Sequence, residues 1–160
     1  MNNSTSTSTS TSTFIVEFLP GIWISNTKSL SEKFLKQKKI KDMIDCDKEL
    51  NFFEGSENYI IAIKNQIKKD QHLKLQTYLF KITEIIHQTI LNAETLLIYD
   101  PLITRKASIL IISYLLRYGQ LRPEKAIHSF MSKSKIPIKL DEDYQIALKL
   151  FYKKIEANFN

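Results

Sequence analysis

One stretch of the sequence, residues 95–119, constrains the fold more than any other. The apolar run 95–99 has the composition of a buried β-strand and stops at Asp100. After a loop of five residues, the segment 106–118 is apolar nearly all round, which is typical of a helix in the centre of a domain. Gly119 is well suited to end that helix. The pattern predicts a strand–loop–helix unit with Asp100 at the carboxyl end of the strand.

Strand and helix patterns alternate along the rest of the chain. Strands are predicted in 14–25 (two short pieces broken by Pro20-Gly21), 40–46 and 58–64. Helices are predicted from a capping box at Ser29-Leu30-Ser31-Glu32 through Gln37, over 75–92, from Pro123, and over 143–156. This alternation predicts an α/β fold with a central, mostly parallel sheet of about four to five strands, flanked by helices on both faces. In such sheets ligands bind at the carboxyl ends of the strands, where Asp100 is expected.

The domain plan follows from composition. Residues 1–13, MNNSTSTSTSTST, offer no apolar group to bury, so we predict a disordered tail followed by a single domain over 14–158. No run approaches the ~20 apolar residues that span a bilayer, and no secretory leader pattern is present. Cys46 is the only cysteine, which excludes an internal disulfide. We predict an intracellular protein of the cytoplasm or nucleus, without a membrane span.

Charge and metal-ligand content narrow the partner classes. The three histidines, His72, His87 and His128, are scattered singly, so we predict no metal site and no other cofactor. The net charge of +6 favours acidic partners such as phosphoproteins, nucleic acid or acidic lipid headgroups. No nucleic-acid motif or aromatic-interleaved basic stripe accompanies the lysines, so a solvated lysine-rich surface is the simpler interpretation.

Six short phrases follow one another along the chain: FLPGIWISN (18–26), IKDMIDC (40–46), YIIAIKNQ (59–66), KASILIISYLL (106–116), RPEKAIHSF (122–130) and KIPIKLDEDYQIAL (135–148). This ordered series resembles the dual-specificity phosphatases of the cysteine-dependent tyrosine phosphatase superfamily. The resemblance covers nearly everything after the tail. It implies the phosphatase fold, and it aligns the loop after Tyr99 with the family signature His-Cys-x-x-Gly-x-x-Arg-Ser.

Every chemically required position of that signature is changed. The five signature positions hold Tyr99, Asp100, Ile103, Lys106 and Ala107 in place of His, Cys, Gly, Arg and Ser. The resemblance places the general acid of the family at Asn65 or Gln66, neither of which is acidic, although Asp70 lies nearby in the sequence. Cys46 belongs to a different predicted strand and cannot replace the missing nucleophile.

The substituted residues oppose phosphate binding on physical grounds. Asp100 cannot form a thiophosphate intermediate, and its charge repels phosphate by roughly 4 kcal/mol per unit charge at about 4 Å. Ile103 disfavours the positive φ that lets loop amides turn toward an anion, and Lys106 lacks the bidentate fork of arginine. We expect the Asp100 carboxylate to accept hydrogen bonds from the loop or the helix N-terminus in place of the phosphate.

A different phosphatase class deserves comparison at the same residues. IYDPLIT partly matches the nucleophile motif of haloacid-dehalogenase-like phosphatases, with Asp100 and Thr104 in place. The second aspartate of that motif is Leu102 here, and the chain leaves no room for the later Mg²⁺ ligands in their usual order. This alternative is disfavoured.

The sequence therefore predicts a catalytically inactive pseudophosphatase that acts as a protein-binding, scaffold or structural module, with a protein partner, phosphorylated or not, and with a homodimer as one arrangement. Two alternatives stay open. Arg105 and Lys106 could retain anion recognition, which would make the protein a phosphoprotein- or phosphate-binding regulator. The basic surface could instead bind nucleic acid, with the steep salt dependence of such binding.

Overall fold

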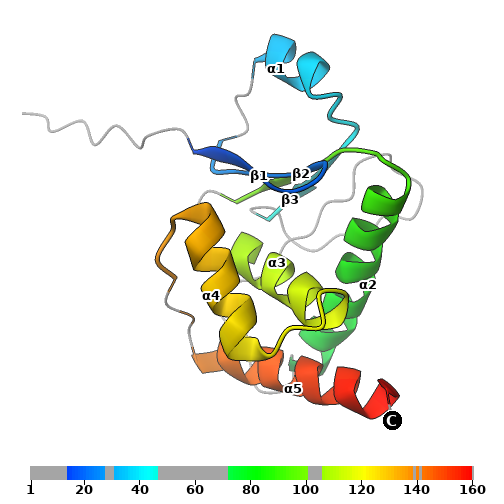
Figure 1. Cartoon of the computed structure of the whole chain (residues 1–160), viewed down its shortest axis with the longest axis vertical. Helices are drawn as coiled ribbons and strands as arrows, with labels where there is room; N and C mark the ends of the chain where they lie inside the picture. Colours follow the sequence, from blue (N-terminus) through cyan, green and yellow to red (C-terminus); the bar gives the residue numbers. More distant parts are fainter. Residues whose placement is uncertain are drawn as a thin grey trace, which may run out of the picture.

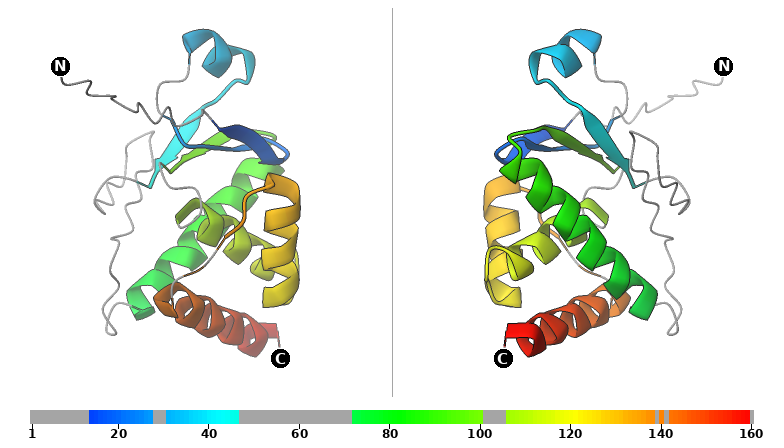
Figure 2. Two further views of the ribbon diagram at one scale, coloured as in Figure 1. Left: turned by 90° about the vertical axis from the view of Figure 1, so that its left-hand side faces the viewer. Right: turned by 90° about the vertical axis from the view of Figure 1, so that its right-hand side faces the viewer.

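A computed structural model describes residues 14–27, 31–46, 72–100, 106–138, 140 and 142–159. The described elements, in chain order, are β1 (Ile15–Leu19), β2 (Ile22–Ser25), α1 (Glu32–Gln37), β3 (Asp42–Asp45), α2 (His72–Leu91), β4 (Leu96–Tyr99), α3 (Lys106–Arg117), α4 (Pro123–Ser134) and α5 (Glu142–Phe159). The sheet lies between α1 on one side and helices α2 to α5 on the other (Figures 1 and 2). The predicted α/β fold with helices on both faces is confirmed.

The sheet is mixed, with four described strands in the order β1-β2-β4-β3. β1 pairs with β2 antiparallel, whereas β4 pairs in parallel with both β2 and β3. The mostly parallel character predicted from the sequence is therefore found in two of the three described pairings, and the antiparallel one joins β2 to β1, at one end of the described order. The strand predicted over 58–64 and the tail predicted over 1–13 lie outside the described residues.

The tight turn between β1 and β2 depends on Gly21. Its φ is +78°, and a Cβ at this position would lie 2.4 Å from the carbonyl oxygen of Glu94. The Gly21 carbonyl in turn accepts a hydrogen bond of 2.8 Å from the Leu96 N–H, at the start of β4. Glycine is required because the turn backbone and the segment before β4 approach more closely than any side chain allows.

Helix α1 begins later than the predicted capping box. The N-cap is Ser31, whose hydroxyl accepts a hydrogen bond of 3.1 Å from the Phe34 N–H, so the proposed box starting at Ser29 is wrong. Both serines suit an N-cap by composition, but only Ser31 directly precedes the first helical residue. Phe34 and Leu35 of this helix are half-buried.

Helix α3 is the centre of the domain. Its ten residues from Ala107 to Leu116 are all buried, and it contacts α2, α4 and α5. A helix covered on every side needs apolar residues all round, which explains why this segment lacks the usual polar stripe. The neighbouring helices are amphipathic, and on α5 the buried side chains are those of Tyr144, Ala147, Leu148, Phe151 and Ile155.

No described helix is both long and apolar enough to cross a membrane.

The last helix, α5, runs to Phe159, three residues beyond the predicted end at residue 156. The final turn bears exposed residues, so apolar periodicity alone could not locate this end.

Ser113 offers a test of the α3 environment. Its side chain is fully buried and its hydroxyl has no hydrogen-bond partner among the described residues. We expect Ser113→Ala to raise the free energy of unfolding by about 1 kcal/mol, because alanine removes an unpaired buried polar group and favours the helix. Urea denaturation measures this change.

Ser108 provides the matched control for that substitution. It is equally buried in the same helix but is engaged in an interaction. Ser108→Ala should therefore leave the stability unchanged or lower it. Equal stabilisation by both substitutions would show that helix propensity alone, and not the unpaired hydroxyl, is responsible.

Candidate functional site

The carboxyl ends of three strands meet at one edge of the sheet. Ser25 of β2 and Asp45 of β3 both lie in register with Tyr99 of β4. Beyond this level, the Asp100 N–H donates a hydrogen bond of 2.9 Å to the Ser25 carbonyl, and the Cys46 N–H donates one of 2.9 Å to the Tyr99 carbonyl. The parallel pairing thus continues one residue further and fixes the backbone of Asp100 where the sequence predicts a site.

The Asp100 carboxylate closes the first turn of α3. Its Oδ2 atom accepts hydrogen bonds from the backbone N–H groups of Lys106, at 3.0 Å, and Ala107, at 2.8 Å. The first amides of a helix have no partner within the helix and carry its positive dipole end, so they attract anions. Asp100 is only 1% exposed. The expectation that it accepts hydrogen bonds from the helix N-terminus is confirmed.

The side chain of Lys106 bridges to the neighbouring strand. Its Nζ donates a hydrogen bond of 2.8 Å to the Cys46 carbonyl, which directly follows β3. Arginine in this position of the signature would present a planar fork to a phosphate, but the lysine ammonium here is directed at a carbonyl of the scaffold. Arg105, Ile103, Asn65, Gln66 and Asp70 lie outside the described residues, so their predicted roles stay predictions.

Cys46 has the opposite properties from a catalytic thiol. It is fully buried. Burial raises the pKa of the Cys46 thiol well above its ordinary value, and the nearby negative charges of Asp100 and Asp45 add to this effect, while Lys106 opposes it. A nucleophilic cysteine requires a lowered pKa and access to the substrate. Cys46 is therefore a protonated packing residue.

Within the described part of the chain, no group of three potential metal ligands comes together.

A polar cluster between α2 and α3 was not predicted. The Tyr118 hydroxyl donates a short hydrogen bond to Glu84 Oε2, and Arg117 Nη2 lies 3.3 Å from the same oxygen. The His87 ring stacks on Tyr118 with its centroid 3.8 Å away. The partners are more than thirty residues apart, so no local motif could have revealed them. These contacts join α2 to the carboxyl end of the central helix α3.

The ionisation of Tyr118 makes that junction sensitive to alkaline pH. Burial, followed by the hydrogen bond to Glu84, raises the pKa of Tyr118 from 10.0 to about 12. Because the folded state holds this proton more tightly, the contribution to stability is complete below about pH 10 and is lost as the pH rises toward about 12. Tyr118→Phe should show a smaller loss of stability over that interval, measured by urea denaturation. Identical alkaline slopes for both proteins would contradict this.

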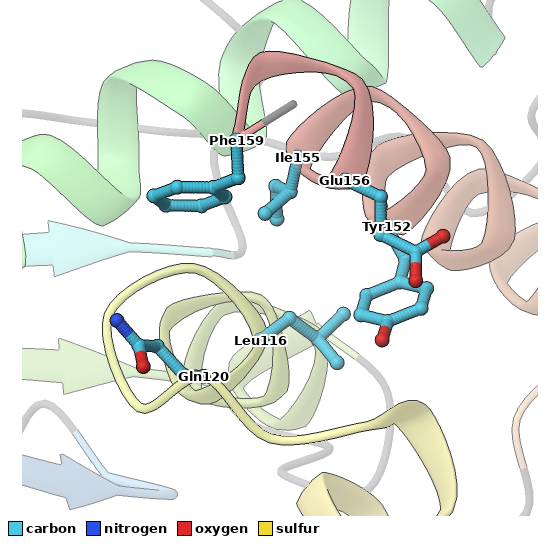
Figure 3. A pocket seen from close by; sticks show the side chains of 6 residues that line it. All are labelled: Leu116, Gln120, Tyr152, Ile155, Glu156 and Phe159. Carbon is cyan, nitrogen blue, oxygen red and sulfur yellow. The ribbon is translucent and has the colours of Figure 1, made fainter.

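A separate hollow of about 560 Å³ lies at the far end of α3 from Asp100. Phe159 and Ile155 of α5 face Leu116 and Gln120 across it, and Tyr152 closes one side (Figure 3). Since α3 has 12 residues, the hollow lies roughly 18 Å along the helix from the phosphatase-type signature. Sequence patterns identified several of these residues as core but did not indicate the hollow.

The comparisons with known proteins point to one fold. No protein-family model matches this sequence, and no curated protein sequence matches it. Among solved structures, a leucine rich repeat and phosphatase domain containing protein from Entamoeba histolytica superposes with a TM-score of 0.72 at 17% identity, over 91% of this chain and 95% of that chain. Human DUSP28 gives 0.71 at 13% identity, over 91% and 99%.

A third solved structure shares this fold. Human tyrosine phosphatase-like serine/threonine/tyrosine-interacting protein gives a TM-score of 0.69 at 14% identity, over 89% of this chain and 97% of that chain. The chain therefore has the fold of the dual-specificity phosphatases. At these identities the likeness is one of fold, and the chemistry must be argued from the residues at the signature position.

Proposed function

We propose that this protein is a catalytically inactive member of the phosphatase-like fold that acts by binding another protein. The observation that carries the proposal is the position of Asp100. Its carboxylate accepts the Lys106 and Ala107 N–H groups at the start of α3, which are groups that an incoming phosphate would need. The site is thus filled by an anion belonging to the chain itself.

The proposed loss of catalysis has two physical causes. A carboxylate in the position of the thiolate cannot form a thiophosphate intermediate. It also repels a phosphate dianion, and the charge that would offset this repulsion, on the Lys106 side chain, is engaged at 2.8 Å with the Cys46 carbonyl. The only thiol of the chain, on Cys46, is buried, so it is not placed to replace the missing nucleophile.

A binding role is the function that we infer for a fold that is intact but lacks the catalytic residues. The core helix α3 and the parallel strands are retained, so the chain still presents a rigid surface of the kind on which partners dock. One neighbour in structure is described as phosphatase-like and as an interacting protein, which supports this reading. The alternative of phosphate recognition through Arg105 and Lys106 is weakened by the contact that Lys106 makes with Cys46.

Turnover assays test the proposal. We expect no hydrolysis of an aryl phosphate or of phosphorylated peptides by the natural protein above the rate of a buffer blank. Hydrolysis that is abolished by Asp100→Ala would overturn the proposal, because it would identify Asp100 as a catalytic group.

A rebuilt variant provides the positive control. Asp100→Cys, Ile103→Gly and Lys106→Arg together restore the three main signature residues. Thermal unfolding in vanadate or tungstate should then show a stabilising shift in the rebuilt variant and none in the natural protein. A shift of equal size in the natural protein would instead favour the phosphate-binding alternative.

A further inference from the structure

A second surface feature lies at the opposite edge of the sheet from Asp100. The first residues of β2, β3 and β4 are in register there, since Ile22 and Asp42 both pair with Leu96. Beside this edge is an open hollow of about 410 Å³, lined by residues of β1, β2, the end of α1 and the approach to β4. We call it the lysine hollow and define it by Glu17, Trp23, Lys38, Lys39, Lys41 and Glu94.

The carboxylates of the lysine hollow are engaged with the scaffold. Glu94 Oε1 lies 2.7 Å from the Nζ of Lys41, and Glu17 Oε1 accepts a hydrogen bond of 2.9 Å from the Gly21 N–H. Lys38 and Lys39 are both exposed and follow each other directly at the end of α1. Lys38 and Lys39 therefore line the hollow as exposed cations, while the carboxylates of Glu17 and Glu94 are held by contacts within the chain.

An aromatic surface adjoins these two lysines. Trp23 is half-buried, the edge of Phe34 meets its ring at a centroid distance of 5.6 Å, and Lys38 Nζ lies 5.1 Å from its centroid. A side chain that combines an apolar surface with a nearby cation is suited to a ligand that carries an apolar group next to an acid.

The backbone that bears the lysines is fixed before any ligand arrives. Lys39 has a left-handed φ of 52°, and its carbonyl accepts a short hydrogen bond from the Thr95 hydroxyl. The next residue but one, Lys41, donates its N–H to the Thr95 carbonyl at 3.3 Å. The turn is thereby tied to the start of β4, which lowers the loss of conformational freedom on binding.

We propose that the lysine hollow is a docking surface for an acidic segment of a partner protein, with an apolar side chain of that segment against Trp23. A peptide can place separate carboxylates at Lys38 and Lys39 and avoid Glu17 and Glu94. A nucleic-acid backbone carries a charge on every residue and would meet both glutamates.

This inference rests on the proposed binding function and names its surface and partner chemistry. Trp23 is the only tryptophan in the chain, so its fluorescence reports on the hollow directly. The probe is a series of short peptides without tryptophan, in which Asp and Glu residues are added stepwise around a central leucine. We expect the fluorescence change and the affinity of the full chain to rise with the number of acidic residues and to weaken as salt is added.

Charge-reversal variants test whether Lys38 and Lys39 are the residues that bind the acidic peptide. Lys38→Glu with Lys39→Glu should weaken binding of the most acidic peptide about tenfold or more, because two attractive contacts become repulsive. The control is Lys125→Glu with Lys153→Glu, two exposed lysines of α4 and α5 on the other side of the sheet. Both double variants lower the net charge from +6 to +2, so they differ only in where the charge is reversed. The control should bind the acidic peptide more tightly than the Lys38 and Lys39 variant does.

Three outcomes would overturn the inference. One is an affinity that does not depend on acidic content. A second is an equal loss in both double variants, which would mean that total charge and not the lysine hollow attracts the peptide. The third is tighter binding of a single-stranded DNA oligonucleotide of the same charge, which would identify nucleic acid as the partner class. None of these outcomes bears on whether the protein hydrolyses phosphate esters. The turnover assay therefore tests the proposed inactivity separately from the proposed docking surface.

Discussion

Replacing Asp100 by alanine is expected to lower the free energy of unfolding by about 3 kcal/mol, although the residue lies at a signature position and not in the apolar core. The carboxylate is 1% exposed and accepts the N–H groups of Lys106 and Ala107. Its removal leaves one buried and one partly buried N–H donor without their partner and withdraws a negative charge from the positive end of a helix. Urea denaturation followed by circular dichroism measures the loss.

Two further measurements separate the contributions of shape and charge. Asp100→Asn keeps the size and one acceptor oxygen, so its loss should lie between that of alanine and zero. Sulfate should stabilise Asp100→Ala more than it stabilises the natural protein, because the vacated helix N-terminus can accept an anion. An alanine variant within about 0.5 kcal/mol of the natural protein would show that the contacts of Asp100 have no structural importance.

Phe151→Ala is expected to have the largest effect on stability, a loss of about 4 kcal/mol in the free energy of unfolding. Phe151 of α5 is fully buried, and its ring centroid lies 4.6 Å from that of Phe80 on α2. The substitution leaves a cavity between two helices that also flank α3. In a thermal scan the loss corresponds to a decrease of roughly 8–16 °C in Tm for a domain of this size.

The same helix supplies the control for that substitution. Phe159 lies two turns further along α5 and is 69% exposed. Phe159→Ala removes the same atoms from a position that is largely in contact with water, so the stability should change by no more than about 0.5 kcal/mol. Similar losses in the two variants would mean that the buried side of α5 has been assigned incorrectly.

The elements that the sequence predicted best are those whose burial is uniform. β4 and α3 are apolar on every side, and a covered strand followed by a covered helix leaves few alternatives. The start of α1 was misplaced because two serines suit the cap, and only the local geometry distinguishes Ser31 from Ser29. Apolar periodicity predicted a helix over 143–156 but could not locate the end of α5, which is made of exposed residues.

The candidate site was predicted in part. The placement of Asp100 at a strand end and its bonding to the helix N-terminus follow from a spacing of a few residues, which local rules describe well. The contact of Lys106 with the Cys46 carbonyl joins residues that are 60 positions apart, and the lysine hollow joins α1 to the approach to β4. Such contacts depend on how strands are ordered in the sheet, and a single sequence carries no direct signal for that order.

The burial of Cys46 has a consequence for how the protein responds to oxidants. Enzymes that use a thiolate nucleophile need an accessible, ionised sulfur, which peroxide also attacks. Here the only sulfhydryl is fully buried and its pKa is raised, and Asp100, at the position of the nucleophile, has no redox chemistry. The fold and the proposed binding surface should therefore be insensitive to peroxide that would inactivate an enzyme with a thiolate nucleophile.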